Sequence, residues 1–521
     1  MIHVVGALRA RLALIVGALV PAAVLIAAAL SPAPARAAAS NARLPGVGHD
    51  ASYRSVPCPN PLIPGIPLAL GPEFRCGYLT VPENRHRLNG RTIQVAVAIA
   101  PAASRHPKLD PLLWLEGGPG GSGLGVANTI VAQGINADRD VIFVDQRGTL
   151  KALPRLGCPT YDTFLNRSFA LAPTSPTARR QAVASVAACR RTWTSRGYDL
   201  GSFNTPENAA DMADLRLALG IKTWNVYGVS YGTDLALQLL RDYPSGIRTE
   251  ALDSVVPPQV NLTTAFWSNA AAGFSAVFRA CDARPACEAA YPHLAQDLLT
   301  AVNRLTRRPV TVRVLDPASH LPTKVVFDGF QFANLLVVLS LTPGSILPMP
   351  AYVHELASGD AAQAAQRLLA TASPVVGLAG DGLAFTVFCS ENAAFTTPAK
   401  ALAAARRALP AFPVQVLALT PQIAHLFADC RAWRVRRAPA GARAPARSRI
   451  PVLEMSGTFD AVTSLAWAKI AAATLPRARI IRFPGLGHGV VTWSQCGAQV
   501  LVGFLNRPGG GYSTRCVGKL P

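Results

Sequence analysis

The segment Gly-Val-Ser-Tyr-Gly at residues 228–232 constrains the fold of this chain more than any other part of its sequence. It follows residues Trp224 to Tyr227, which are predicted to form a strand, and it precedes a helical pattern from Thr233 to about Arg241. A Gly-x-Ser-x-Gly segment between a strand and a helix is typical of a tight turn that holds a serine above a parallel sheet. The same five letters also arise by chance in glycine-rich chains, but the flanking strand and helix favour the turn. Ser230 is therefore the candidate nucleophile.

Strand and helix patterns alternate on both sides of this turn. A capped helix pattern begins at Thr205-Pro206-Glu207 and ends near Gly220. Short apolar or β-rich runs predict strands at residues 78–81, 92–100, 112–115, 141–144, 251–256, 450–455 and 480–483. Such alternation predicts a mostly parallel sheet of the α/β class.

The chain is also expected to carry a helical insertion. Between residues 259 and about 445 the strand pattern fades, and Ala/Leu-rich helical sequence dominates, including residues 351–370 and 401–409. We interpret residues 259–445 as a cap that re-enters the core at its end. On this interpretation, residues 38–258 form the N-terminal part of the core and residues 446–521 form its C-terminal part.

Two residues near the C-terminus complete a candidate catalytic group with Ser230. A serine hydroxyl needs a base to take its proton, and that base needs a partner that fixes its tautomer. Asp460 follows the predicted strand 450–455, and His488 follows the predicted strand 480–483 between two glycines. Because the carboxyl ends of parallel strands meet at one edge of a sheet, we predict that His488 is the base and Asp460 the acid that orients it.

A glycine-rich segment at residues 116–121 follows an earlier predicted strand. Such a turn brings backbone N–H groups to a developing oxyanion, and we expect Gly118 and Tyr231 to be the donors. A plain turn or a phosphate-binding loop is the alternative. The phosphate loop needs a lysine followed by serine or threonine after the glycines, and Ser122-Gly123-Leu124 does not provide them.

Taken together, these segments resemble a family: secreted α/β-hydrolase serine peptidases of the tripeptidyl aminopeptidase-like group, which are related to the prolyl aminopeptidases. The resemblance spans nearly the whole chain after the N-terminal segment. It rests on residues 117–123, 145–148, 228–233, 252–258, 457–463, 487–489 and 496–516. It implies the α/β-hydrolase fold, with a mostly parallel sheet and a mainly helical cap inserted over the cleft.

The resemblance also implies a reaction. It is the release of short peptides or single residues from the free N-terminus of a peptide through an acyl-enzyme, without a cofactor or a metal. Glu391 falls where the cap chain re-enters the core, so it is a candidate to bind the substrate's ammonium group; a structural salt bridge or an exposed position is the alternative. Prolyl aminopeptidases usually have histidine at the position of Glu116, and the group often has proline at Ser464. These departures weaken any expectation of strict proline specificity.

Two other function classes compete with the peptidase. A carboxylic-ester hydrolase would use the same triad, because the triad does not distinguish an amide from an ester. A hydrolase-like binding protein without activity is disfavoured, since every predicted triad position is filled. The sequence does not predict the oligomeric state.

The N-terminal segment, residues 1–37, resembles an export signal. Arg9 and Arg11 precede an apolar stretch, and Ala35-Arg36-Ala37 offers small residues at cleavage spacing. An uncleaved membrane anchor is the alternative, although Pro21 interrupts the stretch. We expect a secreted or extracytoplasmic protein.

The cysteine count fits export. An even number of cysteines, ten, follows the N-terminal segment, and in an exported protein this favours disulfides. Pairing of neighbours is the simplest expectation, with several buried free thiols as the alternative. The predicted pairs are Cys58–Cys76, Cys158–Cys189, Cys281–Cys287, Cys389–Cys430 and Cys496–Cys516.

The chain is strongly basic, with a formal net charge of +21. Nucleic-acid binding is not expected, because no recognisable module combines basic with aromatic residues. Seven arginines instead lie between Arg431 and Arg449, in an Ala/Pro/Gly-rich stretch. Weak attraction to an anionic cell envelope is the partner interaction that this charge suggests, beside a peptide substrate.

Overall fold

The structure is a computed structural model, and it describes residues 43–48, 51–63, 69–87, 89–316, 320–341, 344, 346–372 and 379–520. The export signal predicted for residues 1–37 lies outside these residues. No helix within the described stretches combines the length and the apolar character needed to cross a membrane.

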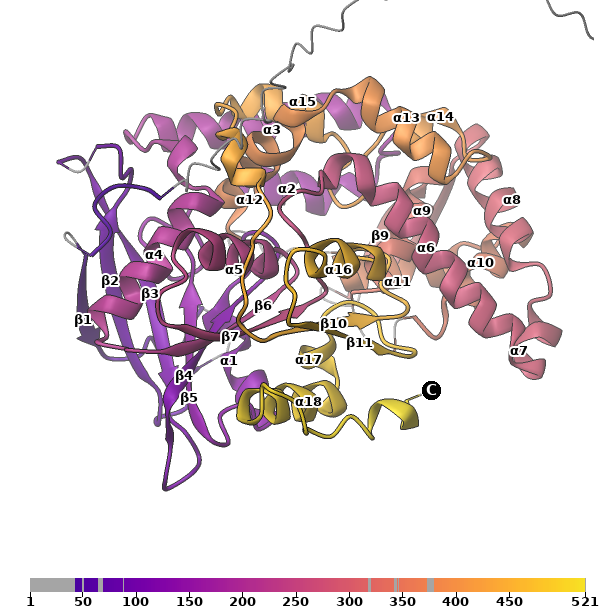
Figure 1. The fold of residues 1–521 in the computed structure, drawn as a ribbon. Coiled ribbons are helices and arrows are strands. Elements are labelled where there is room, and N and C mark those ends of the chain that lie inside the picture. Colours follow the sequence, from indigo (N-terminus) through magenta and orange to yellow (C-terminus); the bar gives the residue numbers. More distant parts are fainter. Residues whose placement is uncertain are drawn as a thin grey trace, which may run out of the picture. The chain divides into compact units, whose positions relative to one another are not determined.

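A nine-stranded sheet forms the centre of the fold (Figure 1). Its strands lie in the order β1-β2-β3-β5-β4-β6-β7-β10-β11. Strands β1, β2, β3 and β5 pair antiparallel, whereas β5, β4, β6, β7, β10 and β11 form a parallel run. The bounds are β1 Ser52–Val56, β2 Arg75–Pro82, β3 Thr92–Ala100, β4 Lys108–Leu115, β5 Arg139–Asp145, β6 Trp224–Val229, β7 Ile247–Asp253, β10 Val452–Gly457 and β11 Ala478–Phe483.

Helices cover both faces of this sheet. In β4, Leu113 and Leu115 join the apolar cluster under α4, α5 and α16, whereas Leu112 and Trp114 join the cluster against α1 and α18, as the period-two geometry of a strand requires. Figure 1 shows α4, α5 and α16 on one side of the sheet and α1 and α18 on the other. The bounds are α1 Gly123–Ala132, α4 Thr205–Ala218, α5 Tyr231–Asp242, α16 Leu465–Ala472, α17 Val490–Trp493 and α18 Gln495–Asn506.

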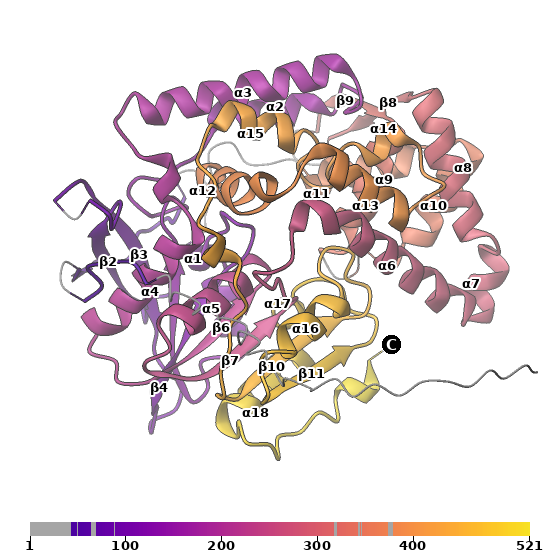
Figure 2. The ribbon, with the colours of Figure 1, turned by 45° about the horizontal axis from the view of Figure 1, so that its top comes forward.

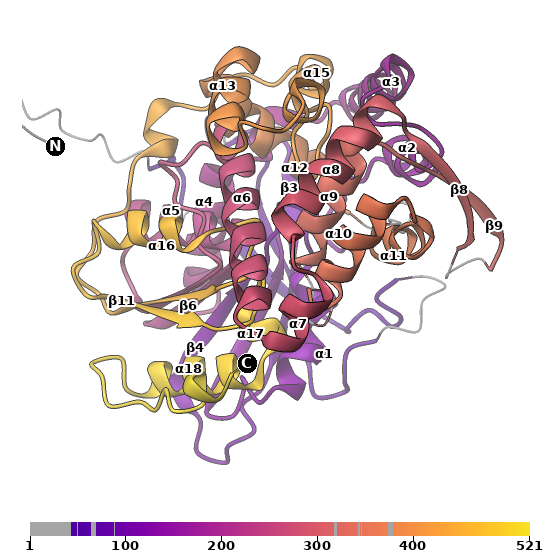
Figure 3. The same cartoon turned by 90° about the vertical axis from the view of Figure 1, so that its right-hand side faces the viewer.

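The segment between β7 and β10, which we call the cap, is mainly helical (Figure 3). It has an apolar cluster of its own, built on α6, α8, α9, α10 and α11. The bounds of its elements are α6 Leu262–Asp282, α7 Pro285–Ala290, α8 Leu294–Arg307, β8 Val310–Leu315, β9 Pro322–Phe327, α9 Gly329–Leu339, α10 Met349–Ser358, α11 Ala362–Ala372, α12 Asp381–Val387, α13 Pro398–Ala408, α14 Val414–Leu417 and α15 Leu426–Trp433.

A second helical segment, outside the predicted insertion, packs against the cap. Helices α2 (Pro159–Ser168) and α3 (Pro176–Thr194) follow β5, and α3 packs along α15 (Figure 2). Sequence reasoning did not assign this segment to any layer. The helical layer over the core therefore comes from two separate parts of the chain.

The predicted mostly parallel sheet is confirmed, and the differences have local causes. Strand β1 was not predicted, and neither was the β8–β9 hairpin inside the cap, where the sequence pattern favoured helices. The helical sequence over residues 351–370 forms two helices, because Gly359, at φ 117°, ends α10 in the left-handed region that favours glycine. Elsewhere, the predicted strands fall inside or within a few residues of observed ones.

All ten cysteines form disulfides, and the five bonds join the neighbours that the sequence predicted. The bond between Cys389 and Cys430 ties the chain after α12 to α15 within the helical layer. The bond between Cys496 and Cys516 fastens the C-terminal tail to α18. The helical layer and the tail are therefore both held covalently.

Candidate active site

Ser230 lies in the turn between β6, a central strand, and α5. Its backbone has φ 56° and ψ −125°, a strained conformation for a residue with a side chain. The turn is crowded: a Cβ on Gly228 would lie 2.2 Å from the carbonyl oxygen of Gly232, and a Cβ on Gly232 would lie 2.1 Å from that of Leu115. Glycine is therefore required at both positions, and this explains the pattern read from the sequence.

Asp460 and His488 lie in contact beyond the ends of β10 and β11. The distance from His488 Nδ1 to Asp460 Oδ2 is 2.9 Å. Asp460 Oδ1 accepts hydrogen bonds from the backbone N–H groups of Val462 and Thr463, and the Thr463 hydroxyl donates to Oδ2 at 2.6 Å. The carboxylate is thus fixed in orientation, and one of its oxygens faces the imidazole.

The environment of this pair sets its charge. Burial raises the pKa of Asp460, but the nearby His488 and the hydrogen bonds from Thr463 outweigh it, so the net shift is downward. Burial lowers the pKa of His488, but the Asp460 charge and hydrogen bond outweigh it, so the net shift is upward. The pair therefore stabilises an imidazolium, which is the state of a base that has taken a proton.

The loop that carries His488 is held by the end of β7. The carboxylate of Asp253 accepts hydrogen bonds from the backbone N–H groups of Val490 and Val491, and the Ser254 hydroxyl accepts one from Gly489. The N–H of His488 donates to the carbonyl oxygen of Ser340, at the end of α9 in the cap. Both the core and the cap therefore position the imidazole.

Ser230 and His488 line the same pocket, as does the glycine-rich turn. Within the described residues, the side chain of Ser230 makes no hydrogen bond to His488, although both residues line this pocket. Hydrogen bonds of this kind are often long in a free enzyme and shorten when substrate binds.

The turn at residues 116–121 lies directly beside the serine. A Cβ on Gly117 would lie 2.8 Å from Ser230 Cβ. Asp145 holds the end of this turn, because it accepts hydrogen bonds from the Ser122 hydroxyl and from the Leu124 N–H. In the part of the chain that the structure describes, the N–H groups of Gly118 and Tyr231 have no protein acceptor. Both predicted oxyanion donors line the pocket.

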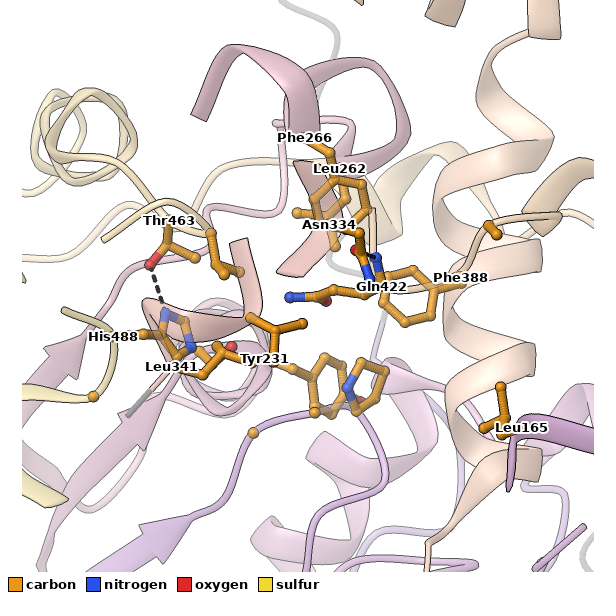
Figure 4. Close-up of a pocket in the computed structure, with 18 of the residues that line it drawn as sticks. Leu165, Tyr231, Leu262, Phe266, Asn334, Leu341, Phe388, Gln422, Thr463 and His488 are labelled. Atoms are coloured by element: carbon orange, nitrogen blue, oxygen red, sulfur yellow. Dashed lines mark hydrogen bonds between the residues drawn. The ribbon is translucent and has the colours of Figure 1, made fainter. Parts of the chain in front are cut away.

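The pocket has a volume of about 670 Å³ and is largely apolar (Figure 4). Its walls come from the core, from the cap and from α2 and α3. Figure 4 shows the amide side chains of Asn334 and Gln422 among aliphatic and aromatic groups such as Phe266 and Phe388. The walls therefore favour an apolar substrate, with a few polar groups to orient it.

The structure does not bring Glu391 to this pocket. Glu391 is buried and is not part of the lining; its two oxygens accept hydrogen bonds from the N–H and the hydroxyl of Thr205. The lining instead includes two other carboxylates, Glu116 and Asp429. Asp429 is 1% exposed, its Oδ1 has no hydrogen-bond partner, and burial raises its pKa to about 7.

Several residues that shape the site were not predicted from the sequence. Thr463, Asp253 and Ser254 lie within motifs that were interpreted only as markers of a family, although their positions at or beyond the carboxyl ends of strands were a usable sign. Asp429 and the walls from α2 and α3 had no local sign, since they reach the pocket through packing between distant segments. Among the described residues, no group of three or more His, Cys, Asp or Glu side chains is arranged to hold a metal ion.

Comparisons with known proteins agree with this geometry. A family described as "alpha/beta hydrolase fold" matches residues 110–304, and one described as "TAP-like protein" matches residues 416–510. The chain is similar to a tripeptidyl aminopeptidase of Streptomyces coelicolor, with 31% identity over 193 residues, and to the serine protease Hip1 of Mycobacterium tuberculosis, with 27% identity over 196 residues. In each case the match covers 36% of this chain and 36% of the relative, so it spans about a third of the relatives' length.

Among solved structures, a proline iminopeptidase of Mycobacterium smegmatis aligns over 83% of this chain and 94% of its own, with 16% identity and a TM-score of 0.31. The sheet order, the turn at Ser230 and the two family matches support one assignment. The chain has the α/β-hydrolase fold, and its C-terminal region is similar to the family described as "TAP-like protein".

Proposed function

We infer that this chain is a serine aminopeptidase, which releases single residues or short peptides from the free N-terminus of a peptide. The contact between His488 and Asp460, with His488 in the pocket that Ser230 also lines, is the observation that supports the serine hydrolase part of this proposal. The aminopeptidase and serine protease among the relatives support a peptide substrate.

The proposed reaction proceeds through an acyl-enzyme. Ser230 Oγ attacks the scissile carbonyl carbon while His488 Nε2 takes the hydroxyl proton, and the N–H groups of Gly118 and Tyr231 stabilise the oxyanion. The C–N bond then breaks as His488 returns the proton to the leaving amine. A water molecule next gives a proton to His488 and attacks the ester carbonyl. The C–Oγ bond then breaks as His488 returns this proton to Ser230 Oγ, which frees the N-terminal fragment and restores both residues.

The lining of the pocket supports a requirement for a free N-terminus. Helices cover the cleft, so a chain end enters it more readily than the middle of a long chain. Glu116 and Asp429 place two carboxylates among apolar walls, where an ammonium group gains from pairing with a negative charge. Glu116 is held by the indole N–H of Trp114 at 2.9 Å, and burial raises the pKa of its carboxyl.

We also propose that the protein works outside the cytoplasm. Five disulfides support this, because such bonds persist in oxidising compartments. The segment that resembles an export signal is consistent with the same location.

The test compares free peptide amides, N-acetylated peptide amides and short-chain esters as substrates of the wild type. We expect acetylation to lower kcat/KM by at least about tenfold, because the ammonium group loses its carboxylate, and tenfold corresponds to about 1.4 kcal/mol of transition-state stabilisation. Glu116→Gln and Asp429→Asn identify which carboxylate is responsible. Glu391→Gln is the matched control, since that carboxylate lies outside the lining.

Equal rates on free and acetylated peptides would reject the aminopeptidase. Turnover of esters without turnover of any peptide would favour a carboxylic-ester hydrolase with the same triad.

A further inference from the structure

A second cavity, of about 1230 Å³, lies on the outer side of the helical layer, between α3 and the region of α14 and α15. Arginines line it. Four come from α3 and two come from the end of α15 and the residue after it: Arg179, Arg180, Arg190, Arg191, Arg431 and Arg434. We call this cavity the arginine groove.

Helical periodicity places these arginines together. On α3, residues 179, 183, 187 and 191 follow a spacing of four and therefore share one face, with Arg180 and Arg190 beside it. The opposite face is buried and includes Ala182, Val186 and Cys189. The arginines lie near the two ends of this face, and the residues between them, Val183, Ala184 and Ala187, are small and apolar. Helix α15 contributes Ala428 and Ala432 to the same lining.

The protein opposes only part of the charge in the groove, since Arg179 and Arg431 interact with the carboxyl of the buried Asp429 and act to lower its pKa. No aspartate or glutamate is part of its lining, and none of the six arginines forms an ion pair within the described residues. Arg190 Nε donates to the carbonyl oxygen of Trp433, and Arg180 donates to the hydroxyl of Thr177. Cations of the same sign repel one another, so an anion that enters the groove is attracted by the arginines nearest to it.

The groove adjoins the candidate active site. Ala424 and His425 are part of the lining of both cavities. Asp429, one turn after His425, lines the pocket and not the groove, so α15 separates the two with its opposite faces. The two cavities are therefore neighbours across the segment 424–429.

We propose that the arginine groove is an exosite that binds acidic residues of the peptide substrate, downstream of the scissile bond. This rests on the proposed peptidase function with Glu116 as the partner of the ammonium group, because Asp429 lies in the wall next to the groove. Arginines at the rim match carboxylates, and the apolar floor matches the aliphatic side chains between them. A polysaccharide or an inorganic anion would leave that floor without a partner.

The test measures binding without turnover, using the full chain with Ser230→Ala. Two peptides with a free N-terminus and a C-terminal fluorescein share their first three residues and continue with Asp-Glu-Asp-Leu or with Asn-Gln-Asn-Leu. In fluorescence anisotropy at low ionic strength, we expect the acidic peptide to bind with a Kd at least about tenfold lower. Added salt at about 0.5 M should remove most of this difference.

A matched pair of variants locates the effect. Arg179→Gln, Arg180→Gln, Arg191→Gln and Arg431→Gln, made together, should abolish the preference. The control removes the same charge outside the groove, with Arg307→Gln, Arg308→Gln, Arg406→Gln and Arg407→Gln, and should retain it. All eight side chains are exposed, and thermal unfolding checks that both variants fold.

Equal affinity for the two peptides, or a preference that survives in the groove variant, would overturn the exosite. So would binding of phosphatidylglycerol vesicles through these arginines without a preference for the acidic peptide. If the wild type cleaves no peptide but still binds the acidic peptide more tightly through the groove, the groove is an acidic-peptide site and the peptidase proposal is wrong. The two proposals can therefore fail separately.

Discussion

At the scale of single residues, Asp460 determines when His488 can accept a proton. His488 must be neutral to act as a base, and the net effect of its surroundings raises its pKa above 6.5. We therefore expect kcat/KM to rise with pH through a midpoint above 6.5. In Asp460→Asn the carboxylate charge is lost, so this midpoint should move to lower pH, while kcat falls by roughly a thousandfold or more.

A pH–rate profile of the wild type and of Asp460→Asn measures both effects. Asp297→Asn is a suitable control, because Asp297 contacts a different histidine, His354, at a partly exposed site in the cap. An unchanged midpoint in Asp460→Asn would mean that a group other than His488 causes the rise of kcat/KM with pH.

At the scale of elements, two neighbouring strands of the sheet carry an unusual pair of carboxyl groups. Glu250 on β7 and Glu454 on β10 are both fully buried, and none of their four carboxyl oxygens has a hydrogen-bond partner in the described structure. Burial raises the pKa of each to about 8, and for Glu250 the nearby Glu454 adds to the shift. Both groups are therefore protonated in the folded protein at neutral pH.

This pair predicts how stability depends on pH. Between the unfolded pKa, about 4.5, and the folded value, about 8, the folded state holds more protons than the unfolded state, so stability falls as pH rises. Each group contributes up to about 1.4 kcal/mol per pH unit within that window. Glu250→Gln with Glu454→Gln should flatten the fall in Tm from pH 5 to 8, whereas the exposed Glu288→Gln should not. An equally steep fall in the double variant would contradict this account.

Most elements of the core could be predicted because their patterns are local. Strand β6, the turn at Ser230 and helix α5 each follow from consecutive residues. Helix α4 was also predicted, although its N-cap is Asn204, one residue before the expected start at Thr205. The helices α2 and α3 and the hairpin β8–β9 could not be placed in the fold, since their positions depend on packing against distant elements. The same is true of the arginine groove, which two segments about 250 residues apart form together.

At the scale of the whole molecule, the sheet explains why the predicted site residues meet. Ser230, Asp460 and His488 each follow a parallel strand, and the ends of parallel strands meet at one edge, so order along the chain was enough to bring them together. No such rule places a residue of the cap. Glu391, which was expected in the cleft, therefore lies outside the pocket lining, and Asp429, which is part of that lining, was not predicted.

The central claim is that Ser230 is the nucleophile and that His488 activates it. Labelling with a fluorophosphonate, followed by mass spectrometry of the digested protein, tests this most directly. We expect one adduct, on the peptide that contains Ser230, no adduct in Ser230→Ala, and labelling slowed by orders of magnitude in His488→Ala because the two residues act as a unit. Equal labelling of the wild type and Ser230→Ala, or an adduct on another serine, would contradict the account.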